Sequence, residues 1–235
     1  MKTLIIIPAF NEEENIEQVI NNLIKNYPKY DYIIVNDCST DNTETVCKKN
    51  GFNYISLPYN LGIGGGVQTG YKYALINGYD FAVQMDGDGQ HNPEYLDQLV
   101  KPLENGECDV VIGSRFIENQ GFQSSGIRRF GIKFLSFLIK LCCGVKVKDV
   151  TSGYRAVNQK LIKIYSENYA DDYPEPEAII AAKMYGAKIK EIPVIMNERT
   201  GGVSSISPIK SIYYMIKVSL AIVLYRLTFS GGKKK

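Results

Sequence analysis

Short runs of apolar and β-branched residues recur along the chain and are separated by stretches with helical spacing. Six of these runs have the length of buried strands: residues 3–7, 30–36, 52–57, 79–85, 108–114 and 188–195. The first five alternate with helical patterns, as parallel strands joined by crossover helices do. The pattern therefore predicts an α/β fold, with a mostly parallel central sheet flanked by helices.

The first crossover helix has the clearest pattern. Its apolar positions follow helical spacing: Ile16, Val19, Ile20, Leu23 and Ile24. Asn11 stands before them with Glu14 three residues later, which is the spacing of a capping box. We therefore expect Asn11 to cap this helix.

Charge divides the chain unevenly, although 235 residues with a net charge of +2 form an ordinary globular composition. Seven Lys or Arg and no Asp or Glu occur from Arg199 onward, which leaves 20 basic and 25 acidic residues before it. We predict a catalytic domain at residues 1–205 and a basic amphipathic tail at 206–235. Such a tail favours an anionic surface, and we expect no nucleic-acid partner.

The cysteines and the N-terminus indicate a cytoplasmic protein. The five cysteines are odd in number and lack the spacing of zinc sites, so we expect free thiols in a reducing cytosol. The first apolar run stops at Pro8 and acidic residues follow, which is unlike a signal peptide.

Acidic residues follow three of the predicted strands. Glu12 comes soon after the first strand, Asp37 ends the second, and Asp86 and Asp88 end the fourth. Ligands of parallel sheets enter at the carboxyl ends of the strands, so these side chains predict one polar cleft.

Asp86 and Asp88 stand one residue apart within the stretch QMDGDGQHNP. Alternating carboxylates in a short turn are oxygen ligands for Mg²⁺ or Mn²⁺. The glycines between them allow Asp88 and Gln90 to face the same point. The alternative is a simple Asx turn, because Asp-Gly pairs are common in turns. His91, the single histidine, is expected to shape the turn and not to act as a base.

Five glycines open the helical stretch NLGIGGGVQTG, at positions 62, 64, 65, 66 and 70. A helix start of this kind can present N–H groups to an anion. The spacing matches neither a Rossmann nor a P-loop fingerprint. A flexible loop with close helix packing is therefore the preferred interpretation.

Seven motifs occur in a familiar order: IIIPAFNEEENI, VNDCSTDNT, NLGIGGGVQTG, MDGDGQHNP, VIGSRF, DVTSGYRAV and GAKIKEIPV with ERTGGVSS. From about residue 3 to 205 the chain resembles family 2 glycosyltransferases, and within them the polyprenyl-phosphate sugar transferases of the dolichyl-phosphate mannose synthase type. The resemblance implies a GT-A fold and inverting transfer from a nucleoside diphosphate sugar.

The resemblance also implies roles for individual residues. Those bordering the nucleoside are Pro8, Phe10 and Glu12, with Asp37 at the base. Asp86 lies near the ribose and sugar, and Asp88 and Gln90 bind the metal. Those gripping diphosphate or acceptor phosphate are Arg115, Arg199, Ser205, Arg128 and Arg129. The metal cation and the arginines would offset the negative charge that develops on the leaving diphosphate.

The general base stays open at this stage. Glu175 falls where relatives with hydroxyl acceptors carry a base, and Glu177 follows two residues later. A sugar hydroxyl must lose its proton, whereas a lipid phosphate is already an anionic nucleophile. With a phosphate acceptor, Glu175 and Glu177 would be structural, metal-facing or sugar-orienting.

Two stretches indicate a membrane surface. Residues 127–141 form a broad apolar face with a narrow basic stripe of Arg129, Lys133, Ser136 and Lys140, as in interfacial helices. A core helix with one solvated face is the alternative. In the tail only eight residues separate Lys217 from Arg226, about 12 Å of helix, far short of a roughly 30 Å hydrocarbon core. We expect an interfacial segment, or one that binds an integral membrane partner or a second copy.

These observations predict a metal-dependent inverting glycosyltransferase, peripheral at the cytoplasmic face of the cell membrane. Its acceptor would be a polyprenyl phosphate or lipid-linked glycan in surface polysaccharide assembly. Three alternatives remain: transfer to a sugar hydroxyl with Glu175 as base, a nucleotidyltransferase, and a nucleotide-sugar-binding regulatory subunit. Pro8, Phe10 and Asn11 occupy the place of a nucleotidyltransferase's glycine-rich loop, which counts against the second.

Overall fold

A seven-stranded sheet forms the centre of the protein, in the order β3-β2-β1-β4-β6-β5-β7. The structure is a computed structural model that describes residues 1–118, 120–121, 126–197 and 208–228. All strands run parallel except β6, which pairs antiparallel with both β4 and β5. The strands are β1 Thr3–Ala9, β2 Asp31–Asn36, β3 Tyr54–Ser56, β4 Phe81–Gln84, β5 Val110–Ser114, β6 Arg155–Asn158 and β7 Ile189–Pro193.

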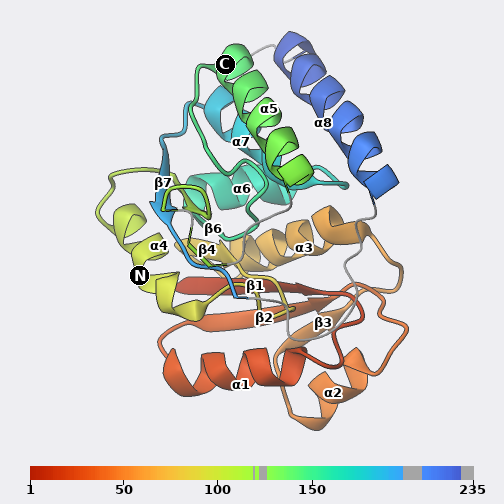
Figure 1. The fold of residues 1–235 in the computed structure, drawn as a ribbon. Coiled ribbons are helices and arrows are strands. Elements are labelled where there is room, and N and C mark those ends of the chain that lie inside the picture. Colours follow the sequence, from red (N-terminus) through yellow and green to blue (C-terminus); the bar gives the residue numbers. More distant parts are fainter. Residues whose placement is uncertain (119, 122–125, 198–207, 229–235) are drawn as a thin grey trace.

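Helices cover both faces of this sheet (Figure 1). One face carries α1 Ile16–Asn26, α2 Thr43–Lys49 and α4 Leu96–Glu104, which follows the short 3₁₀ turn η1 Pro93–Tyr95. The other carries α3 Gly62–Ile76, α5 Gly126–Cys143, α6 Gln159–Glu167, α7 Pro174–Met184 and α8 Pro208–Thr228. The predicted α/β architecture is therefore confirmed.

The central strands are buried on both sides, which explains their unbroken apolar runs. In β1, Leu4 and Ile6 belong to the core beneath α3, α5 and α6, whereas Ile5 and Ile7 belong to the core beneath α1 and α4. Strand β6 escaped prediction because it has only four residues, RAVN, and begins with an arginine.

The expected cap of the first helix is wrong. Helix α1 begins at Ile16, and Asn11 lies five residues before it with φ 56°. The Asn11 side-chain oxygen instead accepts a hydrogen bond from the Thr40 backbone N–H at 2.8 Å, and the Asn11 N–H donates to Ser39 Oγ at 3.0 Å. Asn11 therefore joins the loops that follow β1 and β2.

The glycines of α3 serve close packing, as preferred. A Cβ on Gly70 would stand 2.2 Å from Ile6 Cγ2 of β1, and one on Gly64 would stand 1.9 Å from the Ala170 carbonyl oxygen. The Gly64 N–H donates to the Asp171 carbonyl at 2.9 Å. This N-terminus of α3 is thus fixed against the segment that precedes α7.

Helices α5 and α8 pack side by side at the end of the molecule away from α1 and α2 (Figure 1). In α5, Ile132, Leu135 and Ile139 enter the core, as in a core helix, while a neighbouring apolar row stays exposed. The interfacial role of α5 stays a prediction. No helix in the described part of the chain is both long and apolar enough to span a bilayer. The predicted division at 205/206 falls in the stretch 198–207, outside the described residues.

Candidate active site

The candidate site lies where the parallel strands end, and the backbone there adopts unusual conformations. Asn11 after β1, Cys38 after β2 and Tyr173 before α7 have φ of 56°, 56° and 55°. They are the three described non-glycine residues with positive φ. Such residues cost free energy and collect at functional sites.

The residues predicted to border a nucleoside meet at the ends of β1 and β2. Glu12 is buried; its N–H donates to Thr43 Oγ1 at 2.9 Å, and its carboxylate accepts from Asn15 Nδ2 at 2.7 Å. Asp37 Oδ1 accepts from the Leu61 N–H at 2.7 Å. Burial raises the pKa of Asp37, although the Leu61 and Gly62 N–H groups lower it in part.

Pro8 and Phe10 flank these carboxylates. Pro8 pairs with Val35 in the sheet, and its ring lies close to Gly66 of α3. The Phe10 side chain is exposed just beyond β1. The loops after β1 and β2 thus carry an exposed aromatic ring and two buried carboxylates.

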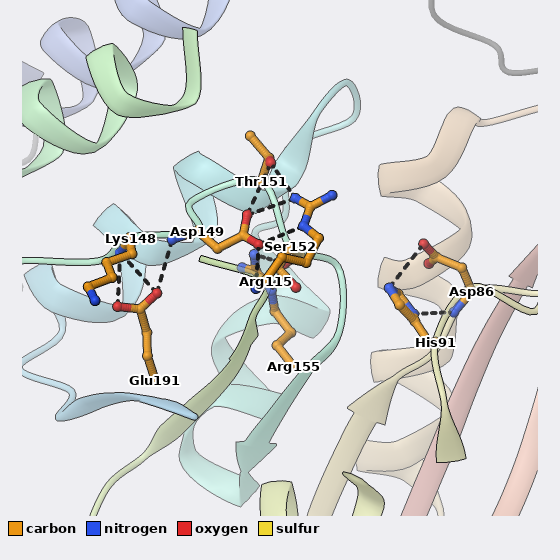
Figure 2. Close-up of polar contacts among 9 residues, drawn as sticks. All are labelled: Asp86, His91, Arg115, Lys148, Asp149, Thr151, Ser152, Arg155 and Glu191. Carbon is orange, nitrogen blue, oxygen red and sulfur yellow. Dashed lines mark hydrogen bonds and ion pairs between the residues drawn. The ribbon is translucent and has the colours of Figure 1, made fainter. Parts of the chain in front are cut away.

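The Asp86–Gln90 turn follows β4 and is fixed by His91. The Asp86 N–H donates to His91 Nδ1 at 2.9 Å, and His91 Nε2 lies 3.7 Å from Asp86 Oδ2 (Figure 2). The His91 ring is buried and stacks on Tyr154, with centroids 4.7 Å apart. These contacts match the expectation that His91 shapes the turn.

The same turn offers oxygen ligands for a cation. Asp88 Oδ1 accepts from the Gln90 N–H at 3.0 Å, so the Asx turn is present, with Gly89 at φ 78°. Within the described residues no three His, Cys, Asp or Glu side chains gather into a complete metal site. Mg²⁺ and Mn²⁺ usually bind one or two carboxylates together with substrate phosphates. The Asp88 carboxylate and the Gln90 side-chain oxygen are donors of this kind in one short turn, so Asp88 and Gln90 are the residues that would hold such a cation.

Arg115 follows β5 and is held by a buried carboxylate (Figure 2). Its Nε and Nη2 donate to the two oxygens of Asp149 at 2.7 and 2.8 Å, and Nη2 also donates to Thr151 Oγ1 at 3.0 Å. Burial lowers the pKa of Arg115, but the Asp149 hydrogen bonds and charge, followed by the carboxylates of Asp86 and Glu175, raise it above its ordinary value. The bidentate geometry fixes the plane of the guanidinium.

Glu175 stands in the first turn of α7, beneath which the fully buried Arg155 lies. Arg155 Nη1 donates to the Glu175 carbonyl at 3.0 Å, and its Nε donates to the Ser152 carbonyl at 3.1 Å. Burial raises the pKa of Glu175; Arg155 and Arg128 lower it in part, and Asp86 raises it further. The charges of Asp86 and Arg128 therefore influence the ionisation of Glu175, and Glu175 in turn influences that of Arg115.

The charges that act on Glu177 differ from those that act on Glu175. Burial raises the pKa of Glu177, and the charges that act on it are Lys217 of α8 and Asp171. The ionisation of Glu175 therefore depends on Asp86, whereas that of Glu177 depends on Lys217 of α8 and on Asp171.

The remaining predicted residues lie on α5 or in the undescribed loop. Arg128 is exposed at the start of α5, and the Arg129 guanidinium lies over the Phe116 ring, 5.7 Å from its centroid. Arg199 and Ser205 lie outside the described residues.

Two central residues were missed from the sequence: Asp149 and Arg155. Both belong to the motif DVTSGYRAV, which carried the family resemblance without a role for either residue. Asp149 and Arg115 stand 34 residues apart, so only the fold reveals the pair.

The family profile described as Glycosyl transferase family 2 matches residues 4–165, more than half of the chain. The chain belongs to glycosyltransferase family 2. The glycosyltransferase is 35% identical over 210 residues to the UDP-N-acetylglucosamine–dolichyl-phosphate N-acetylglucosaminyltransferase of Methanococcus voltae, covering 81% of this chain and 83% of that protein. It is 27% identical over 216 residues to the polyprenol monophosphomannose synthase of Mycolicibacterium smegmatis, and the match covers 88% of this chain and 81% of that protein.

Solved structures confirm the GT-A fold. Glucosyl-3-phosphoglycerate synthase from Mycobacterium tuberculosis, in complex with Mn²⁺, UDP-glucose and phosphoglyceric acid, aligns with a TM-score of 0.71 at 22% identity, over 96% of this chain and 79% of that one. Another structure of that synthase contains Mg²⁺ and UDP. Family membership confirms a nucleotide-sugar glycosyltransferase, and it decides against the nucleotidyltransferase and the regulatory subunit.

Proposed function

We propose that this glycosyltransferase moves a sugar, with inversion, from a nucleoside diphosphate sugar to a polyprenyl phosphate at a membrane surface. The relatives from Methanococcus voltae and Mycolicibacterium smegmatis carry lipid phosphate acceptors in their names. The observation that carries the proposal is the pair of rows on α5: an exposed apolar row lies next to a basic row that begins at Arg129.

Helices α5 and α8 each carry a row of exposed apolar side chains. Phe130 is 75% exposed although it neighbours two arginines, and Leu227 is equally exposed on α8. Together the rows comprise Phe130, Phe134, Phe137, Leu141, Ile216, Leu220, Val223, Leu224 and Leu227. Exposed apolar rows that lie beside cations favour the interface of an anionic membrane over a protein partner. An integral membrane partner or a second copy is the alternative occupant.

The N-terminus of α5 joins this surface to the charges of the site. Arg128 acts on Glu175, and Arg129 stacks on Phe116 next to Arg115. A lipid whose chain rests on the apolar row would therefore present its phosphate to Arg128 and Arg129. Guanidinium groups suit phosphate oxygens because they donate in a planar fork.

The proposed chemistry needs no general base. The acceptor phosphate attacks the anomeric carbon as an anion, and Asp86 would orient donor hydroxyls. Mg²⁺ or Mn²⁺ held by Asp88 and Gln90 would stabilise charge on the departing diphosphate. Arg115 would add to this stabilisation, held in place by Asp149.

Transfer to a sugar hydroxyl is the second candidate. It is favoured by the raised pKa of Glu175, which burial causes and on which the charges of Asp86 and Arg128 also act. A general base works best when its pKa approaches the working pH.

Purified full-length protein can be assayed with a panel of UDP- and GDP-sugars, Mn²⁺ or Mg²⁺, and undecaprenyl phosphate in detergent. Metal-dependent appearance of label in the lipid phase is expected, and vesicles containing anionic lipid should sediment the protein better than neutral ones. Transfer to saccharide hydroxyls alone, abolished in Glu175→Gln, would replace the proposal with the second candidate.

A further inference from the structure

A basic cavity lies between α5 and the turn that carries Lys148. It has a volume of about 400 Å³ and is lined by Phe116, Arg129, Ile132, Lys133, Ser136 and Lys148. Three of these six side chains are cations and none is acidic, so the cavity suits an anionic group. Only Arg129 among them was expected from the sequence to contact phosphate.

The turn that carries Lys148 is held from two directions. The Glu191 carboxylate accepts the Lys148 N–H at 2.9 Å from each oxygen, and it accepts the Asp149 N–H at 3.0 Å (Figure 2). Ser136 of α5 donates its hydroxyl to the Val147 carbonyl. Glu191 belongs to β7 and pairs with Ile112 of β5, so the sheet sets the position of the turn.

The neighbouring residues Lys148 and Asp149 point to different surroundings: one lines the cavity, and the other is buried in the protein. Asp149 is fully buried and binds Arg115, whereas Lys148 is exposed and lines the cavity. Phe116 connects these two surroundings, because Arg115 and Arg129 both lie over its ring, 5.2 and 5.7 Å from the centroid. A shift of the turn would therefore move Lys148 and Arg115 together.

We propose that Lys148 contacts the phosphate of the acceptor in this cavity, and that Glu191 is a positioning residue that sets both Lys148 and Arg115. The inference rests on the proposed transfer to a polyprenyl phosphate. The Lys148 ammonium donates to phosphate oxygens beside Arg129 and Lys133. Glu191 acts only through the backbone of the turn and makes no contact with the acceptor.

The first test measures initial rates against a short-chain polyprenyl phosphate in detergent, at saturating nucleotide sugar. Lys148→Met should raise the KM for the acceptor about tenfold or more, as expected for loss of one charge-assisted hydrogen bond. The KM for the donor should stay unchanged, and Lys148→Arg should restore most of the acceptor affinity. Lys146→Met is the matched control, because it removes the same charge from the same loop outside the cavity lining.

The second test uses Glu191→Gln, which places an amide –NH₂ against one of the two backbone N–H donors. We expect a higher acceptor KM and a lower kcat, since Lys148 and Arg115 both move, with the donor KM unchanged. Lys148→Met combined with Glu191→Gln should raise the acceptor KM by less than the product of the single effects. A Glu191→Gln protein that loses stability but keeps both acceptor KM and kcat would overturn the positioning role.

The outcomes separate this inference from the proposed function. Wild-type protein that transfers to no polyprenyl phosphate defeats the proposed function, and the inference with it. An active wild type whose Lys148→Met variant keeps the wild-type acceptor KM, or loses donor affinity instead, defeats the inference alone.

Discussion

His91 and Asp86 are joined through the backbone: the Asp86 N–H donates to His91 Nδ1 at 2.9 Å. The bond makes Nδ1 an acceptor, so the proton of the neutral ring lies on Nε2, 3.7 Å from Asp86 Oδ2. The ring is also stacked on Tyr154, whose hydroxyl donates to the Asn92 carbonyl at 2.9 Å. His91 thus links the Asp86–Gln90 turn to the residue that precedes β6. This structural role does not require His91 to transfer a proton.

Replacing His91 should therefore affect the shape of the turn. Asn Oδ1 occupies nearly the position of Nδ1, so His91→Asn keeps an acceptor, whereas His91→Leu leaves the Asp86 N–H unpaired. Leu should cost about 1–3 kcal/mol of unfolding free energy, and Asn about 1 kcal/mol through the lost stacking. Urea unfolding measures both. Equal stabilities of the two variants would contradict the acceptor role of Nδ1.

Asp88 should decide the response to divalent cations. In a thermal-shift assay with a nucleotide sugar, Mn²⁺ is expected to add to the stabilisation of wild type, because a ligand that binds only the folded state raises Tm. Asp88→Ala should abolish this added shift. Asp41→Ala, a carboxylate that caps Thr43 of α2, should keep it. An added Mn²⁺ shift that survives in Asp88→Ala would contradict the ligand assignment.

The position of the candidate site at the strand ends was predictable from the sequence, because ligands bind at the carboxyl ends of parallel strands. This rule can be applied without knowledge of side-chain contacts. It predicted that Glu12, Asp37 and Asp86 follow the ends of β1, β2 and β4, as they do in the structure, and their shared role in one cleft stays a prediction. The partners of these residues were not predictable in the same way. Asn11 had the spacing of a helix cap, but tertiary contacts with Ser39 and Thr40 hold it in a left-handed conformation.

Strand β6 illustrates a second limit. Its four residues carry no periodicity, and it exists because Ala82 and Val83 of β4 and Val111 of β5 provide ladders on both sides. Because β6 was not predicted, the sequence indicated neither that Arg155 is buried nor that Asp149 lies beside Arg115. Long-range pairing therefore supplied the part of the site that local patterns missed.

We expect Asp149 to contribute more to the free energy of unfolding than an exposed acidic residue does. Asp149→Ala leaves the buried Arg115 guanidinium without its bidentate partner, which should cost about 3–5 kcal/mol. The double variant Arg115→Met with Asp149→Leu should recover most of that loss, because a buried ion pair can be replaced by apolar groups of similar volume. Urea unfolding of the single and double variants measures the coupling. A loss below about 1 kcal/mol in Asp149→Ala would show that the pair is solvated.

Two glycines of α3 provide a matched pair. Gly70→Ala would put a Cβ 2.2 Å from Ile6 Cγ2, so overpacking should cost about 1–3 kcal/mol. Gly66→Ala meets only Pro8 Cβ at 3.7 Å and should gain up to about 1 kcal/mol from helix propensity. Thermal unfolding followed by circular dichroism measures both. Equal effects of the two substitutions would contradict the packing role of Gly70.

Glu175 should make stability depend on pH in a definite direction. Burial raises its pKa in the folded state above the ordinary value of about 4.3, so the folded state holds this proton more tightly than the unfolded chain does. Its contribution to stability is complete below the ordinary pKa and is lost as pH rises through the raised one. Glu175→Gln stays neutral and escapes this loss.

The stability of Glu175→Gln relative to wild type should therefore increase from pH 4 to pH 8, as measured by urea unfolding at each pH. Glu167→Gln, at an exposed position, is the control and should show no such trend. If the acceptor is a phosphate, Glu175→Gln also keeps transfer to undecaprenyl phosphate. A relative stability of Glu175→Gln that falls with rising pH would mean that Arg155 and Arg128 outweigh burial, and Glu175 would then be a structural anion and not a proton acceptor.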